Sequence, residues 1–206
     1  MHSGALVLAG GGSRRMGRSK AWLKRGDRPL LIHVLQVLTP YRPFVVVAGA
    51  QGRCLPSLPN DVGRVDDPPH ATDGGPIVGL VAGLKRLSEL GVDRAYLTSC
   101  DAAYLTFEHA QRMLEGLSDK PHVDALMPVS QVGGRSCRHA LASAVRVEPL
   151  LGRLNTFFDG GGRRLQAAFE GLELQEIRAE ELCDPRVLLP CNTPEQWAEA
   201  RLKLGT

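Results

Sequence analysis

Glycines and basic residues gather directly after a short apolar run near the start of the chain. The glycines are Gly10, Gly11, Gly12 and Gly17, and the basic residues are Arg14, Arg15, Arg18 and Lys20. Glycines let backbone amides approach an anion closely, and arginine and lysine side chains reach phosphate oxygens. This combination predicts a triphosphate-binding loop. For an isolated glycine triplet, a plain turn beside a solvated basic surface is the more common explanation.

Two familiar glycine motifs fit this segment incompletely. The dinucleotide pattern G-x-G-x-x-G fails because Arg15 occupies its last glycine position, which argues against a redox cofactor. The Walker pattern G-x-x-x-x-G-K-[ST] aligns with Gly12, Gly17 and Ser19, but Arg18 replaces its phosphate-binding lysine. A P-loop hydrolase is therefore the weaker alternative.

Carboxylates and an amide elsewhere in the chain complete a candidate site. Asp101 follows the apolar segment 94–99, and a carboxylate at the carboxyl end of a parallel strand faces the same sheet edge as the loop after strand one. Because Mg²⁺ prefers one or two carboxylates with phosphate oxygens and water, Asp101 is a sensible magnesium ligand. Asp67 on its own is equally explained as a helix cap or turn residue. Asn192 precedes a capping box, T-P-E-Q at 193–196, that opens a final helix.

Alternating extended and helical segments must position these residues. Extended segments are expected at 5–9, 44–48, 94–99, 125–129, 139–147 and 172–177. Helices are expected at 31–38, 76–87, 106–117, from Pro149 onward, 163–169 and 194–204. Strands that alternate with helices indicate an α/β fold with a mostly parallel central sheet covered on both faces.

Composition narrows the class of protein. With 206 residues, 43% of them hydrophobic and 23% charged, the chain is expected to form one globular domain over residues 1–206. A net charge of +3 is too small to argue for nucleic-acid binding. Five scattered cysteines indicate neither a disulfide framework nor a zinc site and suit a reducing cytoplasm. No apolar run reaches the roughly 18 residues of a membrane span and no secretory leader is recognisable, so neither a membrane nor export is expected.

The glycine segment matches the pattern L-A-G-G-x-S-x-R-M-G-x-x-K throughout. This stretch resembles the signature of nucleotidyltransferases, and within them the molybdenum cofactor guanylyltransferases. Further segments resemble that family in order and spacing: V-D-D at 65–67, G-P-I-V-G-L at 75–80, L-T-S-C-D at 97–101, G-R with R-H-A-L at 134–141 and C-N-T-P-E at 191–195. The resemblance covers essentially the whole chain and implies a three-layer, Rossmann-like nucleotidyltransferase fold.

The resemblance also implies a reaction and a set of site residues. It implies transfer of GMP from GTP to the terminal phosphate of molybdopterin, with Mg²⁺ as cofactor and pyrophosphate as the second product. The implied nucleotide contacts are Leu8, Ala9, Gly10, Gly11, Lys20, Asp67, Asp101 and Asn192, and the implied catalytic residues are Arg15, Lys20 and Asp101, with Asp101 as the metal ligand. The expected partners are GTP, molybdopterin and, transiently, other molybdenum cofactor biosynthesis proteins or a molybdoenzyme.

Some positions depart from the family pattern. The proline usual after the metal aspartate is missing, since Ala102 and Ala103 follow Asp101, and Ala140 replaces a proline after His139. The family often has an asparagine after its second strand, where this chain has A-G-A at 48–50.

By the same resemblance, L-A-G-G at 8–11 is guanylyl-type, which favours guanine over cytosine as the base. The alternatives left open are a cytidylyl or sugar-phosphate transferase and a non-catalytic accessory protein for a molybdoenzyme. His139 is equally explained as a pterin-side residue or a packed histidine.

Overall fold

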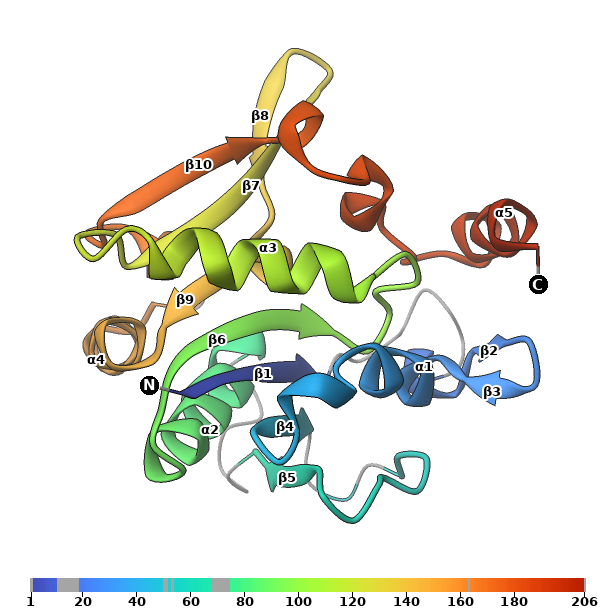
Figure 1. Ribbon diagram of the computed structural model, residues 1–206, viewed down its shortest axis with the longest axis horizontal. Helices are drawn as coiled ribbons and strands as arrows, with labels where there is room; N and C mark the ends of the chain where they lie inside the picture. The colour runs from blue at the N-terminus through green and yellow to red at the C-terminus, as the bar shows by residue number, and fades with distance from the viewer. Residues whose placement is uncertain are drawn as a thin grey trace.

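The computed structural model describes residues 2–10, 19–49, 52, 54–67, 75–162 and 164–205. The strands are β1 (His2–Leu8), β2 (Lys24–Arg25), β3 (Arg28–Pro29), β4 (Val45–Gly49), β5 (Gly63–Asp66), β6 (Val92–Ser99), β7 (Ala125–Val132), β8 (Arg135–Arg138), β9 (Ala144–Arg146) and β10 (Leu174–Arg178). The α-helices are α1 (Leu30–Val37), α2 (Gly75–Glu89), α3 (Phe107–Ser118), α4 (Val147–Asp159) and α5 (Pro194–Leu204). Figure 1 shows the strands other than β2 and β3 stacked into one twisted sheet, with β2 and β3 paired apart from it.

The sheet has the order β10-β7-β9-β6-β1-β4-β5, and β8 pairs with β7 outside this path. Strand β1 runs parallel to β4 and β6, β4 to β5, and β7 to β10. Strand β9 is antiparallel to both β6 and β7, so β7 runs in the same direction as β6. The carboxyl ends of β1, β4, β5, β6, β7 and β10 therefore meet at one edge. The mostly parallel sheet expected from the sequence is confirmed.

Helices cover both faces of the sheet. Ala5 and Val7 of β1 pack with α1 and α3 in one core cluster, while Leu6 and Leu8 pack with α2 and α4 in another. All of these β1 side chains are buried, which explains why residues 5–8 of β1 are continuously apolar instead of alternating. The arrangement is three-layered.

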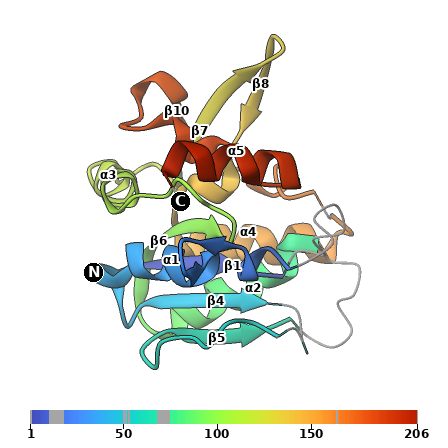
Figure 2. The same ribbon diagram turned by 90° about the vertical axis from the view of Figure 1, so that its right-hand side faces the viewer.

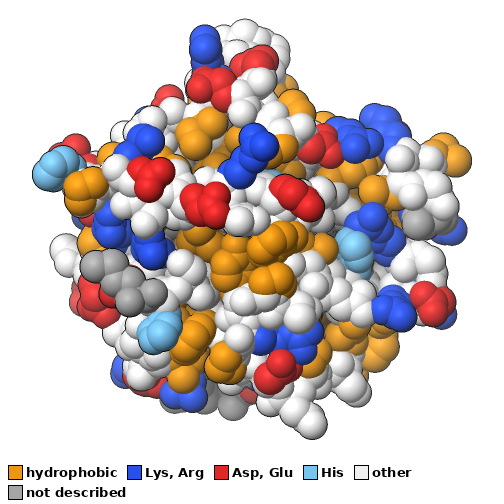
Figure 3. Space-filling view, viewed as in Figure 1, with side chains coloured by type: hydrophobic (Ala, Val, Ile, Leu, Met, Phe, Trp, Pro, Cys, Tyr) orange, Lys and Arg blue, Asp and Glu red, His pale blue; other side chains and the backbone are white. Residues whose placement is uncertain are grey.

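Among the described residues no helix is both long and apolar enough to cross a membrane. Basic and acidic side chains intermingle on the face shown in Figure 3.

Two sequence predictions at the far side of the sheet are wrong. The segment 139–147 is not one strand, because a 3₁₀ turn at Ala140–Ala142, closed by the Ser143 hydroxyl donating to the Ala140 carbonyl at 2.7 Å, precedes β9. The expected helix at 163–169 is reduced to the 3₁₀ turn Ala167–Phe169, and Arg163 lies outside the described residues. The Ala168 N–H is shared between the Arg164 and Leu165 carbonyls, both at 3.2 Å, and after this single helical turn the chain turns at Gly171, where φ is +87°, toward β10.

Gly4 provides a sharp test of the packing at β1. A Cβ atom at Gly4 would lie 2.5 Å from the backbone oxygen of Phe44, and that oxygen accepts the Ala5 N–H at 2.9 Å. Because the carbonyl cannot retreat without losing this hydrogen bond, we expect Gly4→Ala to lower the free energy of unfolding by about 1–3 kcal/mol in urea denaturation. Gly152 in α4 is the control, since a Cβ there meets nothing within 4 Å and Gly152→Ala should be neutral or stabilising. Equal losses in both variants would contradict this account.

Candidate functional site

The strand ends at the carboxyl edge are tied together by backbone hydrogen bonds. The Ala9 N–H donates to Ala48 at 2.7 Å, and the Cys100 N–H donates to Leu8 at 2.9 Å. The side chains of Leu8 and Ala9 are buried, so contacts from these two residues to a ligand must come from their backbone. Gly10, the next residue of the predicted nucleotide segment, is half-buried. Gly11 and Arg15 lie outside the described residues.

Asp67 lies beside helix α2 at the end of β5. Its N–H donates to the Gly49 carbonyl at 2.8 Å, which extends the sheet by one residue. A Cβ at Gly79 in α2 would lie 3.4 Å from Asp67 Oδ1 and 3.3 Å from Leu8 Cδ2. The glycine therefore lets α2 approach the ends of β1 and β5 closely. This proximity places a carboxylate beside the predicted nucleotide segment, as the sequence led us to expect.

Lys20, Asp101 and Asn192 meet although they are far apart in the sequence. Lys20 Nζ lies 2.5 Å from Asp101 Oδ2 and donates to Asn192 Oδ1, also at 2.5 Å. The Ser99 hydroxyl donates to the second Asp101 oxygen at 2.5 Å. The side chains of Lys20 and Asp101 are 18% and 15% exposed, so the pair is partly shielded but open to a ligand. We call Lys20, Asp101 and Asn192 the charged cluster.

Local structure explains how each member of the charged cluster is placed. Lys20 opens a 3₁₀ turn, Lys20–Trp22, and Asp101 lies in the turn after β6. Asn192 precedes the N-cap of α5, where the Thr193 hydroxyl accepts the Gln196 N–H and the Gln196 side chain accepts the Asn192 N–H at 2.8 Å. The Thr193 cap expected from the sequence is thus present, but the Gln196 side chain accepts from Asn192 instead of Thr193, so the reciprocal half of the expected capping box is displaced by one residue.

Helix α5 is held close to the charged cluster by a small apolar core. The buried members of this core are Leu23, Leu30, Ala103, Tyr104, Cys191, Trp197 and Ala200. It joins the segment after Lys20, the loop after Asp101 and α5 into one packed unit. Figure 2 shows α5 lying between the β7–β8 hairpin and α1. The end of the chain therefore completes the site formed by its beginning and middle.

Cys191 lies next to the charged cluster but is not its anionic group. Burial, with a further contribution from the Asp101 charge, raises the pKa of the Cys191 thiol to about 11. The thiol therefore stays protonated at neutral pH. The negative charge of the site is that of Asp101.

The donor atoms of the charged cluster fit a hard cation. Asp101 Oδ2 and Asn192 Oδ1 both converge on the Lys20 ammonium, which shows that a positive charge is accommodated between them. Among the described residues no group of three or more His, Cys, Asp or Glu side chains is arranged to hold a metal ion. Such a site suits Mg²⁺ that takes its other ligands from phosphate and water.

The two carboxylates lie at different places along the edge. Asp67 follows β5 and Asp101 follows β6, and strands β1 and β4 lie between them. With about 4.8 Å between neighbouring strands, the two residues are separated by roughly 14 Å. The structure thus groups Asp101 with Lys20 and Asn192, and groups Asp67 with Leu8. An elongated ligand along the edge is needed to contact both groups.

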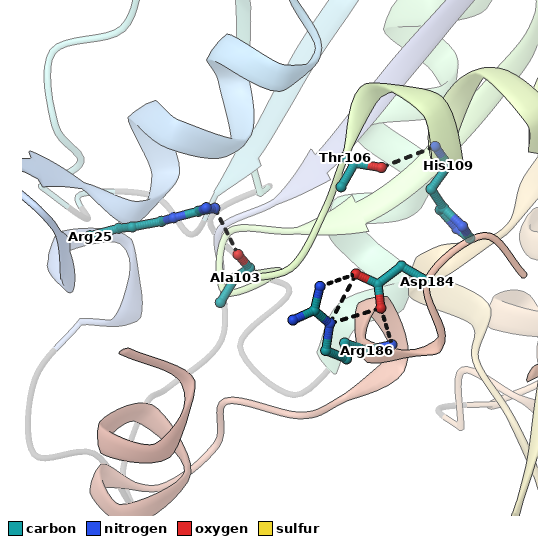
Figure 4. A network of polar contacts seen from close by, with 6 residues as sticks. All are labelled: Arg25, Ala103, Thr106, His109, Asp184 and Arg186. Atoms are coloured by element: carbon teal, nitrogen blue, oxygen red, sulfur yellow. Dashed lines mark hydrogen bonds and ion pairs between the residues drawn. The ribbon is translucent and has the colours of Figure 1, made fainter. Parts of the chain in front are cut away.

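The loop after Asp101 has a basic neighbour that sequence reasoning missed. Arg25 Nη1 donates to the Ala103 carbonyl at 2.9 Å and also donates to His33 Nε2. Figure 4 shows Arg25 reaching this loop from the β2–β3 hairpin, with the Asp184–Arg186 ion pair on the other side of the loop. The sequence shows an arginine five residues after Lys20, but the direction in which the Arg25 side chain points depends on the β2–β3 hairpin.

The residues expected at the pterin side lie on and after the β7–β8 hairpin. Ser130 Oγ and His139 Nε2 are hydrogen-bonded at 2.8 Å, and burial lowers the pKa of His139. Arg135 is exposed near the hairpin tip, whereas Arg138 pairs with Glu176 at 2.7 Å. An open cavity of about 420 Å³ adjoins this pair, lined by Ser136, Arg138, Gln166, Glu170 and Glu176. His139 is therefore packed against Ser130, and its part in binding stays a prediction.

The environment of His33 predicts a pH dependence of stability. Burial, with a smaller effect of the Arg25 charge, lowers the pKa of His33 to about 4 in the folded protein, compared with 6.5 for an unperturbed histidine side chain. Between these values the unfolded chain binds a proton that the folded chain does not, so stability falls as the pH drops from about 6.5 to 4. Burial lowers the pKa values of His109 and His139 in the same direction. Urea denaturation at several pH values should show a shallower fall for His33→Gln, and an unchanged slope would contradict the assignment.

Comparisons with known sequences identify the family that the chain matches. A family model described as the MobA-like NTP transferase domain matches residues 5–176. The probable molybdenum cofactor guanylyltransferase of Mycobacterium tuberculosis is 33% identical over 190 residues, which cover 91% of this chain and 88% of the relative. The protein of the same name from Mycobacterium avium is 32% identical over 195 residues, covering 94% and 92%.

Solved structures share the fold. Molybdopterin-guanine dinucleotide biosynthesis protein A from Archaeoglobus fulgidus superposes with a TM-score of 0.76 at 18% identity, covering 100% of this chain and 99% of that protein. The 2-C-methyl-D-erythritol 4-phosphate cytidylyltransferase of Thermus thermophilus superposes with a TM-score of 0.68 at 17% identity, covering 100% of both chains. The nucleotidyltransferase fold expected from the sequence is confirmed.

Proposed function

The chain belongs to the MobA-like NTP transferase family, and from this membership we propose that it transfers GMP from GTP to the terminal phosphate of molybdopterin. The names of its relatives from Mycobacterium favour the guanylyl reaction over the cytidylyl and sugar-phosphate alternatives. The observation that carries the proposal is the charged cluster, in which Lys20, Asp101 and Asn192 converge at the carboxyl edge of the sheet.

The reaction needs positioning and charge compensation, with no protein nucleophile. An oxygen of the molybdopterin phosphate attacks the α-phosphorus of GTP and forms a new P–O bond. The bond from the α-phosphorus to the bridging oxygen of the β-phosphate breaks, and pyrophosphate leaves with that oxygen. Both reactants are anions, so the protein must hold them in line and offset their repulsion.

Each residue of the site has a part in this proposal. Lys20 and Arg15 bring positive charge to the phosphates, and Asn192 binds substrate beside them. Asp101 would hold Mg²⁺, which supplies compensation of the negative charge on the triphosphate. Backbone groups of residues 8–11 and the Asp67 carboxylate would contact the guanosine. The roughly 14 Å between Asp67 and Asp101 lets one extended nucleotide contact both ends of the edge.

The proposal also gives a setting for the protein. We place the reaction in the cytoplasm, with residues 1–206 acting as a single nucleotidyltransferase domain. The dinucleotide product must pass to a molybdoenzyme, so we expect transient contact with such an enzyme or with other proteins of cofactor biosynthesis.

Product analysis tests the proposal directly. The protein is incubated with Mg²⁺ and molybdenum-loaded molybdopterin, and with GTP, CTP or ATP in separate reactions, and dinucleotides are identified by mass spectrometry. We expect a guanine dinucleotide and pyrophosphate only when both GTP and the pterin are present, and no product when Mg²⁺ is chelated. Product with CTP alone would make the protein a cytidylyltransferase. Steady release of inorganic phosphate from nucleotide alone would favour a hydrolase, and binding without product would favour an accessory protein.

A further inference from the structure

Arg25 is a half-buried cation whose contacts are to neutral groups. Its guanidinium donates to the Ala103 carbonyl at 2.9 Å and to His33 Nε2. In the described part of the chain no carboxylate lies within salt-bridge distance of Arg25. Removing a charge from water without an opposite charge is unfavourable, and burial accordingly lowers the pKa of Arg25. A costly arrangement of this kind calls for an explanation beyond stability.

The acceptor of Arg25 lies in the turn that carries Asp101. The Ala103 N–H donates to the Asp101 carbonyl at 2.9 Å, which closes a three-residue turn. The Ala103 carbonyl then accepts the Arg25 guanidinium, so both backbone groups of Ala103 are engaged. The Ala103 side chain is buried in the core shared with α5. The turn is thus held from inside by its own hydrogen bond and from outside by Arg25.

The resemblance to the guanylyltransferases leads one to expect a proline shortly after Asp101, and this chain has none at residues 102 and 103. The usual proline after the metal aspartate is replaced here by Ala102 and Ala103. Proline restricts φ by its ring, whereas alanine leaves φ free. A turn without proline needs another restraint if the Asp101 carboxylate is to keep its direction. Besides the hydrogen bonds within the turn, the guanidinium of Arg25 is a restraint that reaches it from another segment of the chain.

We propose that Arg25 is a positioning residue for Asp101, holding the turn of residues 101–103 through the Ala103 carbonyl in place of the missing proline. His33 supports this role by accepting from Arg25 through a neutral Nε2. The short strands β2 and β3 present Arg25 toward the turn, while Lys20 reaches Asp101 from the same segment of the chain. The segment 20–25 thus supplies both Lys20, which contacts the Asp101 carboxylate, and Arg25, which holds the turn that orients it. An effect of Arg25 on catalysis rests on the proposed function. That Arg25 holds the turn of residues 101–103 can be tested without any nucleotide.

The first test is hydrogen exchange by mass spectrometry on the ligand-free full chain. In Arg25→Met we expect amides in the peptide covering residues 100–105 to exchange at least about 10-fold faster than in wild type, while peptides from β4 and α2 are unchanged. Arg25→Lys, which keeps one donor, should fall between the two. Arg28→Met is the matched control, since Arg28 pairs with Arg25 across the hairpin but is exposed. Unchanged exchange at 100–105, equal acceleration in every peptide, or the same effect in Arg28→Met would each overturn the proposal.

The second test asks whether the turn controls binding at Asp101. Calorimetry of Mg²⁺ and GTP should show about 10-fold weaker Mg²⁺-dependent binding in Arg25→Met than in Arg28→Met, with partial rescue in Arg25→Lys. Equal affinities in the two methionine variants would overturn the link from Arg25 to Asp101. If wild type binds no GTP in the presence of Mg²⁺, the proposed function fails, and the exchange measurement still decides whether Arg25 holds the turn.

Discussion

Replacing Asp101 with asparagine is expected to lower guanylyl transfer by about 10²- to 10³-fold, the usual effect of removing one electrostatic contact to a transition state. Asparagine has nearly the same shape, and its single amide oxygen can accept from Lys20 while its NH2 group donates to the Ser99 hydroxyl, which are the two partners of the Asp101 oxygens in wild type. The fold should therefore survive. The lost property is the negative charge, which is what a divalent cation requires at this position. Initial rates of dinucleotide formation at saturating GTP measure the effect.

Asp93, on the strand β6 that leads to Asp101, gives the matched control. Asp93 lies at the opposite end of β6 and accepts the His2 backbone N–H at 2.7 Å, far from the charged cluster. Asp93→Asn should keep wild-type transfer, and circular dichroism should report the same fold for both variants. Near-normal turnover in Asp101→Asn would refute the role assigned to Asp101. A rate that recovers at high Mg²⁺ concentration would instead locate the loss in metal binding.

The sequence predicted that Asp101 and the loop that ends at Lys20 share one sheet edge, and the reason lies in the topology. Lys20, Asp101 and Asn192 each follow or precede a recognisable element, and the carboxyl ends of parallel strands share one edge. Once alternating strands and helices indicate a parallel sheet, a residue after β6 is expected at the same edge as the loop after β1, and the structure adds that these two strands are neighbours. Asn192 was harder to place from periodicity, because the packing of α5 that brings it in depends on side chains from three separate segments. Its position came from the resemblance.

Arg25 could not be predicted in the same way. Strands β2 and β3 have two residues each, too few for an alternating pattern to be recognised. Its target is a backbone carbonyl, which any residue presents, so the identity of Ala103 carries no signal. The helix expected at 163–169 is a related case, because the local spacing favours a helix whereas the chain forms only a 3₁₀ turn, which buries Phe169 before the chain turns at Gly171. Sequence patterns do not predict side-chain contacts to backbone groups or the effects of tertiary packing on a short segment.

Lys20 is expected to show two effects of opposite sign. In the ligand-free protein its ammonium occupies the space between Asp101 Oδ2 and Asn192 Oδ1, the same oxygens that suit a metal cation. Lys20→Met removes this competitor, so Mg²⁺ should bind the nucleotide-free variant more tightly than wild type. The same change removes positive charge from the phosphates and should lower transfer by about 10²- to 10³-fold. Calorimetry of Mg²⁺ without nucleotide and initial-rate measurements separate the two effects.

The control for Lys20 lies four residues further along the chain. Lys24 is exposed on β2, and Lys24→Met removes the same charge from the same segment without touching Asp101. It should leave both Mg²⁺ binding and transfer at wild-type values. If Lys20→Met weakened Mg²⁺ binding instead, Lys20 would act by organising Asp101 and Asn192, and its loss would resemble that of Arg25. If transfer were unchanged, the charge of Lys20 would play no part in the reaction. Tighter Mg²⁺ binding together with slower transfer in Lys20→Met would support both assigned roles. The ammonium would then compete with Mg²⁺ at Asp101 in the ligand-free protein and contact phosphate during the reaction.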